Sequence, residues 1–197
     1  MKTATSKKLR DPAQAREALV QSAIKLFNTK TYFNTDSNEI AKAAGYTPGT
    51  FYRYFKDKLE IFKEVYCVWH EQQRLAIMDL LEHNHIPEEF CRKLTTTILP
   101  FYVEWSGFRA SVRCLSATDK QVLKFRLERR EGLINLTNLV RRSFGKPIKP
   151  VVETLFMLLT LERISDAVAD GDFKYLKISL GEVTQRLEKL FLDYLLE

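Results

Sequence analysis

Hydroxyl, phenol and guanidinium side chains follow one another between residues 47 and 54, in the run Thr-Pro-Gly-Thr-Phe-Tyr-Arg-Tyr. Hydroxyls and phenols donate hydrogen bonds to phosphate and sugar oxygens, and a guanidinium holds either a phosphate or the edge of a guanine. A threonine methyl also suits the methyl group of thymine, and a glycine lets the backbone approach a duplex closely. The run therefore predicts nucleic-acid contacts from Thr47, Pro48, Gly49, Thr50, Tyr52, Arg53 and Tyr54.

Three short helices are predicted to position these side chains. Apolar residues recur on one helical face over residues 12–27, which predicts the first helix. Thr35 is expected to cap a second helix that Gly45 closes, and Thr47 is expected to cap the third. A short turn built on a glycine sets two helices at a steep angle, which is the helix-turn-helix layout. The hydroxyls of Thr35 and Thr47 would then lie where a phosphate binds.

A structural interpretation competes with the functional one for several of these residues. Phe51 and Phe55, four residues apart, are expected to form the core of the module. Tyr52 either contacts DNA or packs as a half-buried ring. Thr35 and Thr47 either bind phosphate or serve as ordinary helix caps. The functional interpretation is favoured because these residues converge on one small module.

The positive charge of the chain is concentrated near its N-terminus. Residues 1–57 hold ten Lys or Arg against five Asp or Glu, which accounts for +5 of the formal net charge of +6. Because neutralising phosphates releases counterions, a cationic module on a near-neutral body suits binding to a polyanion. Lys7, Lys8 and Arg10 are predicted to form a flexible arm that follows the DNA backbone or reaches a minor groove.

A longer pattern of specified positions spans the same module. It comprises Leu19, Ala23, Leu26-Phe27, Ile40-Ala41, Ala44-Gly45, Thr47, Gly49-Thr50, Phe51-Tyr52, Tyr54-Phe55, Lys58 and Ile61-Phe62. In this order and spacing, residues 10 to 65 resemble the DNA-binding domain of the tetracycline-repressor (TetR) family. The resemblance implies that Lys58 clamps a phosphate. Thr31 stands where the family usually has glycine, and Ser37 where it has an apolar residue, departures that concern stability more than DNA contact.

The resemblance has further implications for the rest of the chain. It implies a homodimer whose interface is built from the last two helices, expected near residues 150–169 and 180–196, although their apolar residues could equally form internal core. The two recognition helices would read a palindromic operator about one DNA turn apart. It also implies a pocket for an unknown small-molecule effector. Aromatic residues are the candidates for lining that pocket, or else they form ordinary core: Trp69, Phe101, Tyr102, Trp105, Phe108 and Phe125.

The whole chain is predicted to be all-α, because no stretch shows sustained period-two alternation bounded by hairpin turns. Residues 1–57 are expected to form the three-helix, helix-turn-helix DNA-binding domain, and residues 58–197 a larger helical domain for regulation and dimerisation. A long fourth helix, capped by Asp57, is expected to connect them, and Gly107 to break a later helix.

Catalytic and metal-binding motifs are missing from the sequence. Cys67, Cys91 and Cys114 are odd in number and far apart, which indicates neither a disulfide framework nor a zinc site. His83 and His85 have no nearby cysteine or paired carboxylates to complete a metal site. Without a signal peptide or an apolar run of about 18 residues, we expect a cytoplasmic protein with no membrane span, cofactor or enzymatic activity.

Three hypotheses of function follow from these patterns. The first is a transcriptional regulator that acts as a homodimeric repressor and leaves its operator when a ligand binds. The second is an activator or nucleoid-type binder built on the same module. The third is a ligand-carrying or enzymatic helical protein that has lost DNA binding.

Overall fold

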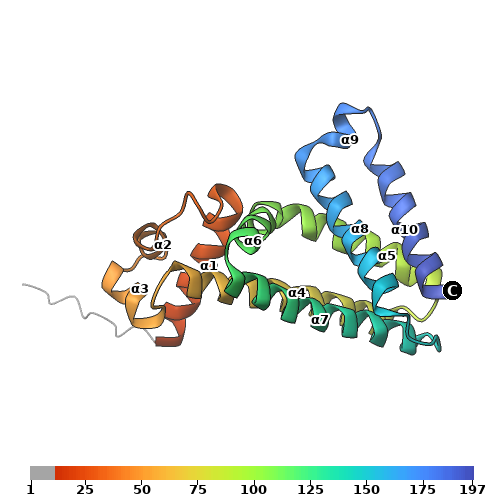
Figure 1. Cartoon of the computed structure of the whole chain (residues 1–197), viewed down its shortest axis with the longest axis horizontal. Coiled ribbons are helices and arrows are strands. Elements are labelled where there is room, and N and C mark those ends of the chain that lie inside the picture. The colour runs from red at the N-terminus through yellow and green to blue at the C-terminus, as the bar shows by residue number, and fades with distance from the viewer. Residues whose placement is uncertain (1–11) are drawn as a thin grey trace, which may run out of the picture. The chain divides into compact units, whose positions relative to one another are not determined.

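The computed structural model describes residues 12–197, and every regular element in that range is a helix, which confirms the all-α prediction (Figure 1). The predicted basic arm, Lys7, Lys8 and Arg10, lies outside the described residues. The helices are α1 (Pro12–Lys30), α2 (Ser37–Ala43), α3 (Pro48–Tyr54), α4 (Lys58–His83), α5 (Pro87–Glu104), α6 (Ser106–Thr118), α7 (Lys120–Ser143), α8 (Val151–Asp170), α9 (Asp172–Tyr175) and α10 (Leu180–Leu196).

The chain divides into two compact units, one ending at Cys67 and the other running from Val68 to Glu197. The division falls inside α4, so this one helix contributes residues to both units. Across residues 12–197, we find no helix whose length and apolar character would let it cross a membrane.

The first unit is a small helical module with an aromatic core. α2 packs against both α1 and α3, and Gly45 makes the turn between α2 and α3 with a φ of 76°, a conformation that glycine adopts without strain. Phe51 and Phe55 are buried, as predicted. The rings of Phe27 and Phe62 meet edge to face with their centroids 5.4 Å apart. Because Phe51 and Phe55 hold one face of α3 in the core, its other side chains point outward.

The turn between α1 and α2 differs from the prediction in its cap. Asp36, not Thr35, is the N-cap of α2, and its carboxylate accepts a hydrogen bond from the backbone N–H of Glu39 at 2.8 Å. The Thr35 cap prediction was wrong by one position, because threonine and aspartate are both good caps and stand side by side here. Thr31, in the same turn, has a φ of 65°, a left-handed conformation that strains a β-branched residue.

The second unit is built from α5 to α10 and the C-terminal part of α4. α5 packs against α8 and α10, while α7 packs against α6 and α8. The helix break expected at Gly107 lies at Trp105, because α5 ends at Glu104 and α6 already includes Gly107. The short helix α9 was also missed from the sequence. It follows Gly171, whose φ of 85° ends α8.

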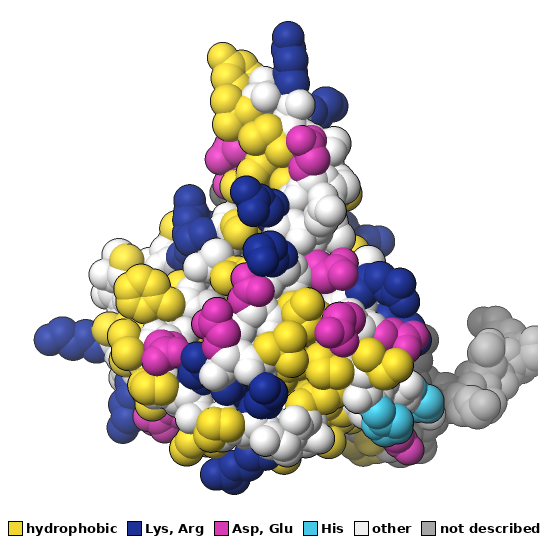
Figure 2. All heavy atoms as spheres, turned by 90° about the vertical axis from the view of Figure 1, so that its right-hand side faces the viewer, with side chains coloured by type: hydrophobic (Ala, Val, Ile, Leu, Met, Phe, Trp, Pro, Cys, Tyr) yellow, Lys and Arg dark blue, Asp and Glu magenta, His cyan; other side chains and the backbone are white. Residues whose placement is uncertain are grey.

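Exposed apolar side chains gather on α8 and on the segment from α9 to the start of α10. Figure 2 shows such side chains on the surface of this unit, including the projecting end that carries α9. Phe156 of α8 has 70% of its side chain exposed. The other exposed apolar residues of these elements are Val151, Val152, Leu159, Tyr175, Leu176, Ile178 and Leu180.

A buried ion cluster joins α6 to α8 in the second unit. Asp166 of α8 is 2% exposed and lies 2.9 Å from the guanidinium of Arg109 and 2.8 Å from that of Arg113, both on α6. Arg109 is buried as well, and its Nη2 also donates to the carbonyl of Glu162 at 2.9 Å. Each buried charge is thus matched by an opposite charge and by hydrogen bonds, as burial of ions requires.

Candidate nucleic-acid interface

The outward face of α3 carries most of the side chains predicted to contact DNA. Tyr52 is 55% exposed, and its ring lies edge to face on Phe51 with centroids 5.3 Å apart. Thr47 and Thr50 have their hydroxyl oxygens 3.2 Å apart. Besides these, the structure places Pro48, Gly49 and Arg53 in exposed positions and Thr50 and Tyr54 in half-buried ones.

The N-terminus of α3 is positioned by the features that the sequence predicted. Thr47 is the N-cap residue, with extended backbone angles, and Pro48 occupies the first turn. Within the described residues the Thr47 hydroxyl makes no capping hydrogen bond and meets only the hydroxyl of Thr50. At the helix start the backbone N–H groups of Thr50 and Phe51 both donate to the Thr47 carbonyl, so the two hydroxyls are the donors that this end of α3 offers to a phosphate.

Gly49 occupies a position at which the fold does not require glycine. A Cβ atom added there would meet the Thr47 hydroxyl at 3.9 Å, an ordinary contact, as the closest atom of the described chain. The φ of Gly49 does not lie in the left-handed region, unlike that of Gly45. Glycine in a helix costs about 1 kcal/mol relative to alanine. An exposed glycine without a steric or conformational role in the fold fits a surface that another molecule approaches closely.

Contrary to the prediction, the side chains of Thr35 and Lys58 do not point toward an external ligand. Thr35 is 2% exposed, and its hydroxyl donates to the carbonyl of Thr31 at 2.8 Å. The Nζ of Lys58 donates to the carbonyls of Tyr32 and Thr35 at 2.8 and 2.7 Å, and lies 4.1 Å from the centre of the Tyr32 ring. Both side chains bind the turn between α1 and α2, so we leave their side chains out of the contact surface.

The surroundings of Lys58 also affect its charge. Desolvation lowers the pKa of Lys58, and the nearby carboxylate of Asp36 opposes that shift. The two hydrogen bonds to backbone carbonyls make Nζ of Lys58 an internal donor of the module. Sequence reasoning missed this role because the two carbonyl partners belong to a turn more than twenty residues earlier in the chain.

Two further cations were missed from the sequence as candidates. Lys42 of α2 and Lys56 after α3 are exposed, and neither they nor Arg53 form an ion pair with any residue of 12–197. Lys30, by contrast, pairs with Glu39. Unpaired cations next to exposed hydroxyls are the electrostatic requirement for phosphate binding.

The aromatic residues proposed for an effector pocket pack against one another instead. Trp69 lies parallel to Phe101 with centroids 6.5 Å apart, and Trp105 meets Phe108 edge to face at 5.5 Å. Tyr102 lies 5.5 Å from Trp69. Mutual packing of rings satisfies their shape and polarity, so these residues form core rather than the wall of a cavity.

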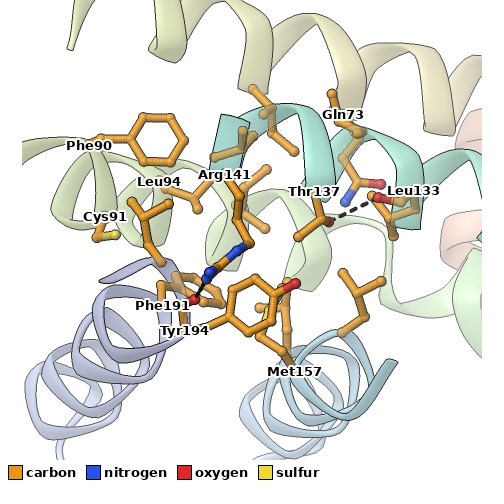
Figure 3. A pocket seen from close by; sticks show the side chains of 17 residues that line it. Gln73, Phe90, Cys91, Leu94, Leu133, Thr137, Arg141, Met157, Phe191 and Tyr194 are labelled. Atoms are coloured by element: carbon orange, nitrogen blue, oxygen red, sulfur yellow. Dashed lines mark hydrogen bonds between the residues drawn. The ribbon is translucent and has the colours of Figure 1, made fainter. Parts of the chain in front are cut away.

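One cavity of the second unit lies elsewhere and is lined by other residues (Figure 3). It has a volume of about 60 Å³ and is bounded by side chains of α4, α5, α7, α8 and α10. None of the six aromatic candidates, Trp69, Phe101, Tyr102, Trp105, Phe108 and Phe125, lines this cavity. Phe125 instead lies half-buried on α7, with the guanidinium of Arg129 5.1 Å from its ring centre. In the described part of the chain, no cluster of three or more histidine, cysteine or carboxylate side chains could hold a metal ion.

The short α2, the glycine turn and the outward face of α3 define a helix-turn-helix module. Residues 19–65 match the family model described as "Bacterial regulatory proteins, tetR family". The N-terminal module formed by these residues is therefore of the tetR-family type, as the resemblance in the sequence implied.

Named relatives match only part of the chain. The chain is 39% identical over 62 residues to the HTH-type transcriptional regulator AcrR of Shigella flexneri, a match that covers 31% of this chain and 29% of AcrR. It is 32% identical over 76 residues to the uncharacterised HTH-type transcriptional regulator YdgC of Bacillus subtilis, covering 39% of each. The matches thus span well under half the length of these relatives. Both are named as regulators rather than enzymes, in agreement with the sequence-based expectation.

The fold similarity extends over nearly the whole chain. A putative TetR-family transcriptional regulator from Rhodococcus sp. superposes with a TM-score of 0.75 at 15% identity, covering 94% of this chain and 100% of that one. At this level of identity the similarity concerns the fold alone.

Proposed function

We propose that the chain is a DNA-binding transcriptional regulator whose α3 enters the major groove. The observation that carries the proposal is Gly49, an exposed helical glycine for which the fold has no steric or conformational need. Hydroxyls at the start of the helix, a half-exposed tyrosine and an arginine that forms no ion pair within residues 12–197 surround it. The proposed contacts are Thr47, Pro48, Gly49, Thr50, Tyr52, Arg53 and Tyr54.

We further propose that the chain acts as a homodimer through α8 and α10. Supporting this, α8 exposes Phe156, Val152 and Leu159 to solvent, more apolar surface than an isolated subunit usually leaves uncovered. A two-fold dimer would present two α3 helices to a palindromic operator with half-sites about 34 Å apart, one turn of DNA. Such a regulator would act in the cytoplasm, as a repressor that a small-molecule effector releases. Activation of transcription is the alternative.

Substitution of Gly49 tests the DNA interface without disturbing the fold. Gly49→Ala should be folded and slightly more stable, because alanine favours the helix and the added methyl meets only ordinary contacts. Its affinity for a palindrome selected from random DNA should nevertheless fall at least tenfold, because the methyl group separates the backbone from the duplex. Fluorescence anisotropy at fixed salt measures this change.

Gly132→Ala is the matched control. Gly132 lies within α7, where an added Cβ meets no atom of the described chain within 4 Å, so it should give the same helix stabilisation and leave DNA affinity unchanged. Tyr52→Ala should weaken binding and relax sequence preference. If the wild type binds no DNA, the third hypothesis, a helical protein without DNA binding, replaces this proposal, whereas binding without sequence preference would support the nucleoid-type binder.

A further inference from the structure

The cavity of the second unit has apolar walls and a single charged group. α7 supplies one wall with residues three and four apart, including Leu133, Thr137 and Arg141. Phe191 of α10 and Met157 of α8 face it from the other elements (Figure 3). Aliphatic and aromatic side chains make up most of the wall, which favours an apolar occupant, and because the cavity holds only about 60 Å³ these side chains must move apart to admit an organic ligand.

Arg141 is buried without a counterion. It is 1% exposed, its Nε donates to the carbonyl of Pro147 at 2.7 Å, and its Nη1 donates to the carbonyl of Tyr194. Its Nη2 has no hydrogen-bond partner among the described residues, and no carboxylate of residues 12–197 forms an ion pair with it. The guanidinium carbon also lies 5.3 Å from the centre of the Tyr194 ring, so an aromatic ring, but no carboxylate of residues 12–197, compensates its positive charge.

Other arginines of α6 and α7 that point into this unit form ion pairs with carboxylates. Arg109 lies 2.9 Å from Asp166, and Arg130 lies 2.8 Å from Glu162. The fold thus supplies a carboxylate to each of these guanidinium groups but not to Arg141. A buried charge without a counterion is strongly unfavourable. A carboxylate from a ligand would therefore give Arg141 the ion pair that Arg109 and Arg130 already have.

Gln73 adds a second polar point on the cavity wall. It is 2% exposed, and its side-chain nitrogen donates to the hydroxyl of Tyr102 at 2.7 Å. The side-chain oxygen of Gln73 has no partner among the residues described. Cys91, also on the wall, offers no reactive thiolate, because burial and two nearby carboxylates raise its pKa to about 12.

We propose that this cavity binds a small organic monocarboxylate, with the carboxylate on Nη2 of Arg141 and an apolar body between α5, α7 and α10. The Gln73 oxygen would accept a hydrogen bond from a ligand that carries a donor at its far end. This names the class of the effector in the proposed function and rests on that proposal only for its regulatory meaning, since binding can be measured without DNA.

Calorimetric titration of the full-length protein with three probes of equal length tests the ligand class. Hexanoate should bind at least tenfold more tightly than 1-hexanol, because the carboxylate gains a charge-assisted hydrogen bond to a desolvated guanidinium. Hexylamine, which carries a like charge, should not bind measurably. Equal binding of the three probes, or no binding of hexanoate, would overturn the proposal.

Two variants assign the effect to Arg141. Arg141→Met should remove the advantage of hexanoate over 1-hexanol, while Arg142→Met, its exposed neighbour on α7, should keep it. Arg141→Met also removes two hydrogen bonds to carbonyls and could unfold the unit. Thr137→Phe covers that case, since it retains Arg141 and fills the cavity, and it should abolish binding of both hexanoate and 1-hexanol. Unchanged hexanoate binding in Thr137→Phe would contradict the site.

The outcome for DNA is measured separately. Hexanoate binding without any effect on operator affinity would retain the ligand site and refute release by this ligand. Operator binding without hexanoate binding would retain the regulator and refute the site.

Discussion

Replacing Lys58 by methionine tests whether this lysine holds the module together. The substitution keeps most of the apolar stem and removes the ammonium, which donates to the carbonyls of Tyr32 and Thr35. Hydrogen bonds from a charged donor contribute about 1.5–3 kcal/mol each when buried, and a cation over an aromatic ring about 0.5–1 kcal/mol at an exposed site. Because Lys58 is only partly buried, water can replace part of these hydrogen bonds in the variant, which reduces the loss of free energy. We expect the free energy of unfolding to fall by about 2 kcal/mol.

Thermal unfolding followed by circular dichroism measures the loss of stability. For a chain of this size a change of 2 kcal/mol lowers the Tm by about 4–8 °C. Lys56→Met is the matched control, because Lys56 is exposed and forms no ion pair within residues 12–197, and its Tm should stay within about 1 °C of wild type. Equal Tm values for the two variants would refute the structural role of Lys58.

The salt dependence of DNA binding separates this role from a phosphate clamp. Removing one cation that neutralises a phosphate reduces the slope of log K against log salt by about 0.9. If Lys58 serves the turn and not the duplex, Lys58→Met should leave that slope unchanged at a temperature well below its Tm. A slope smaller by about 0.9 with an unchanged Tm would instead support the phosphate clamp implied by the family resemblance.

Three further substitutions test other features of the fold. Thr31→Gly should raise the unfolding free energy by about 0.5–1 kcal/mol in urea titrations, because glycine relieves the left-handed strain at a smaller cost in chain entropy; a loss of stability would contradict this. Asp166→Asn should lower it by about 3 kcal/mol, because Arg109 is left buried without its counterion; a change below 1 kcal/mol would show that the cluster is dispensable. Burial and two nearby arginines lower the pKa of His70 to about 4. The unfolded chain therefore binds a proton below pH 6.5 that the folded one does not, and stability should fall by about 3 kcal/mol as the pH drops from 6.5 to 4. In His70→Gln the free energy of unfolding should not show this fall between pH 6.5 and 4. If stability depends on pH in the variant as it does in the wild type, the role given to His70 is refuted.

The helix-turn-helix could be predicted in detail because its signals are local. Pro48 after a capping threonine, a glycine turn and two phenylalanines four apart specify α3 and its buried face within a dozen residues. The two errors in this module concern the N-cap of α2 and the role of Lys58. Asp36, and not the adjacent Thr35, is the N-cap of α2. Lys58 donates to carbonyls of a turn that is distant in the sequence, so the spacing of residues could not predict this contact.

The cavity in the second unit could not be predicted, and the pair Arg141 and Arg142 shows why. The two arginines are neighbours of identical type on α7, yet Arg141 is buried and Arg142 is exposed. What separates them is the approach of α10, whose Tyr194 carbonyl accepts a hydrogen bond from Arg141 although it lies 53 residues further along the chain. The aromatic residues of the sequence suggested a pocket at Trp69 and Trp105, but these residues pack as core. The hydrophobicity of a residue predicts that it is buried, but it does not predict where the packing leaves a cavity. Such long-range packing buries Arg141 and leaves its Nη2 without a hydrogen-bond partner among residues 12–197, and only a structure reveals that.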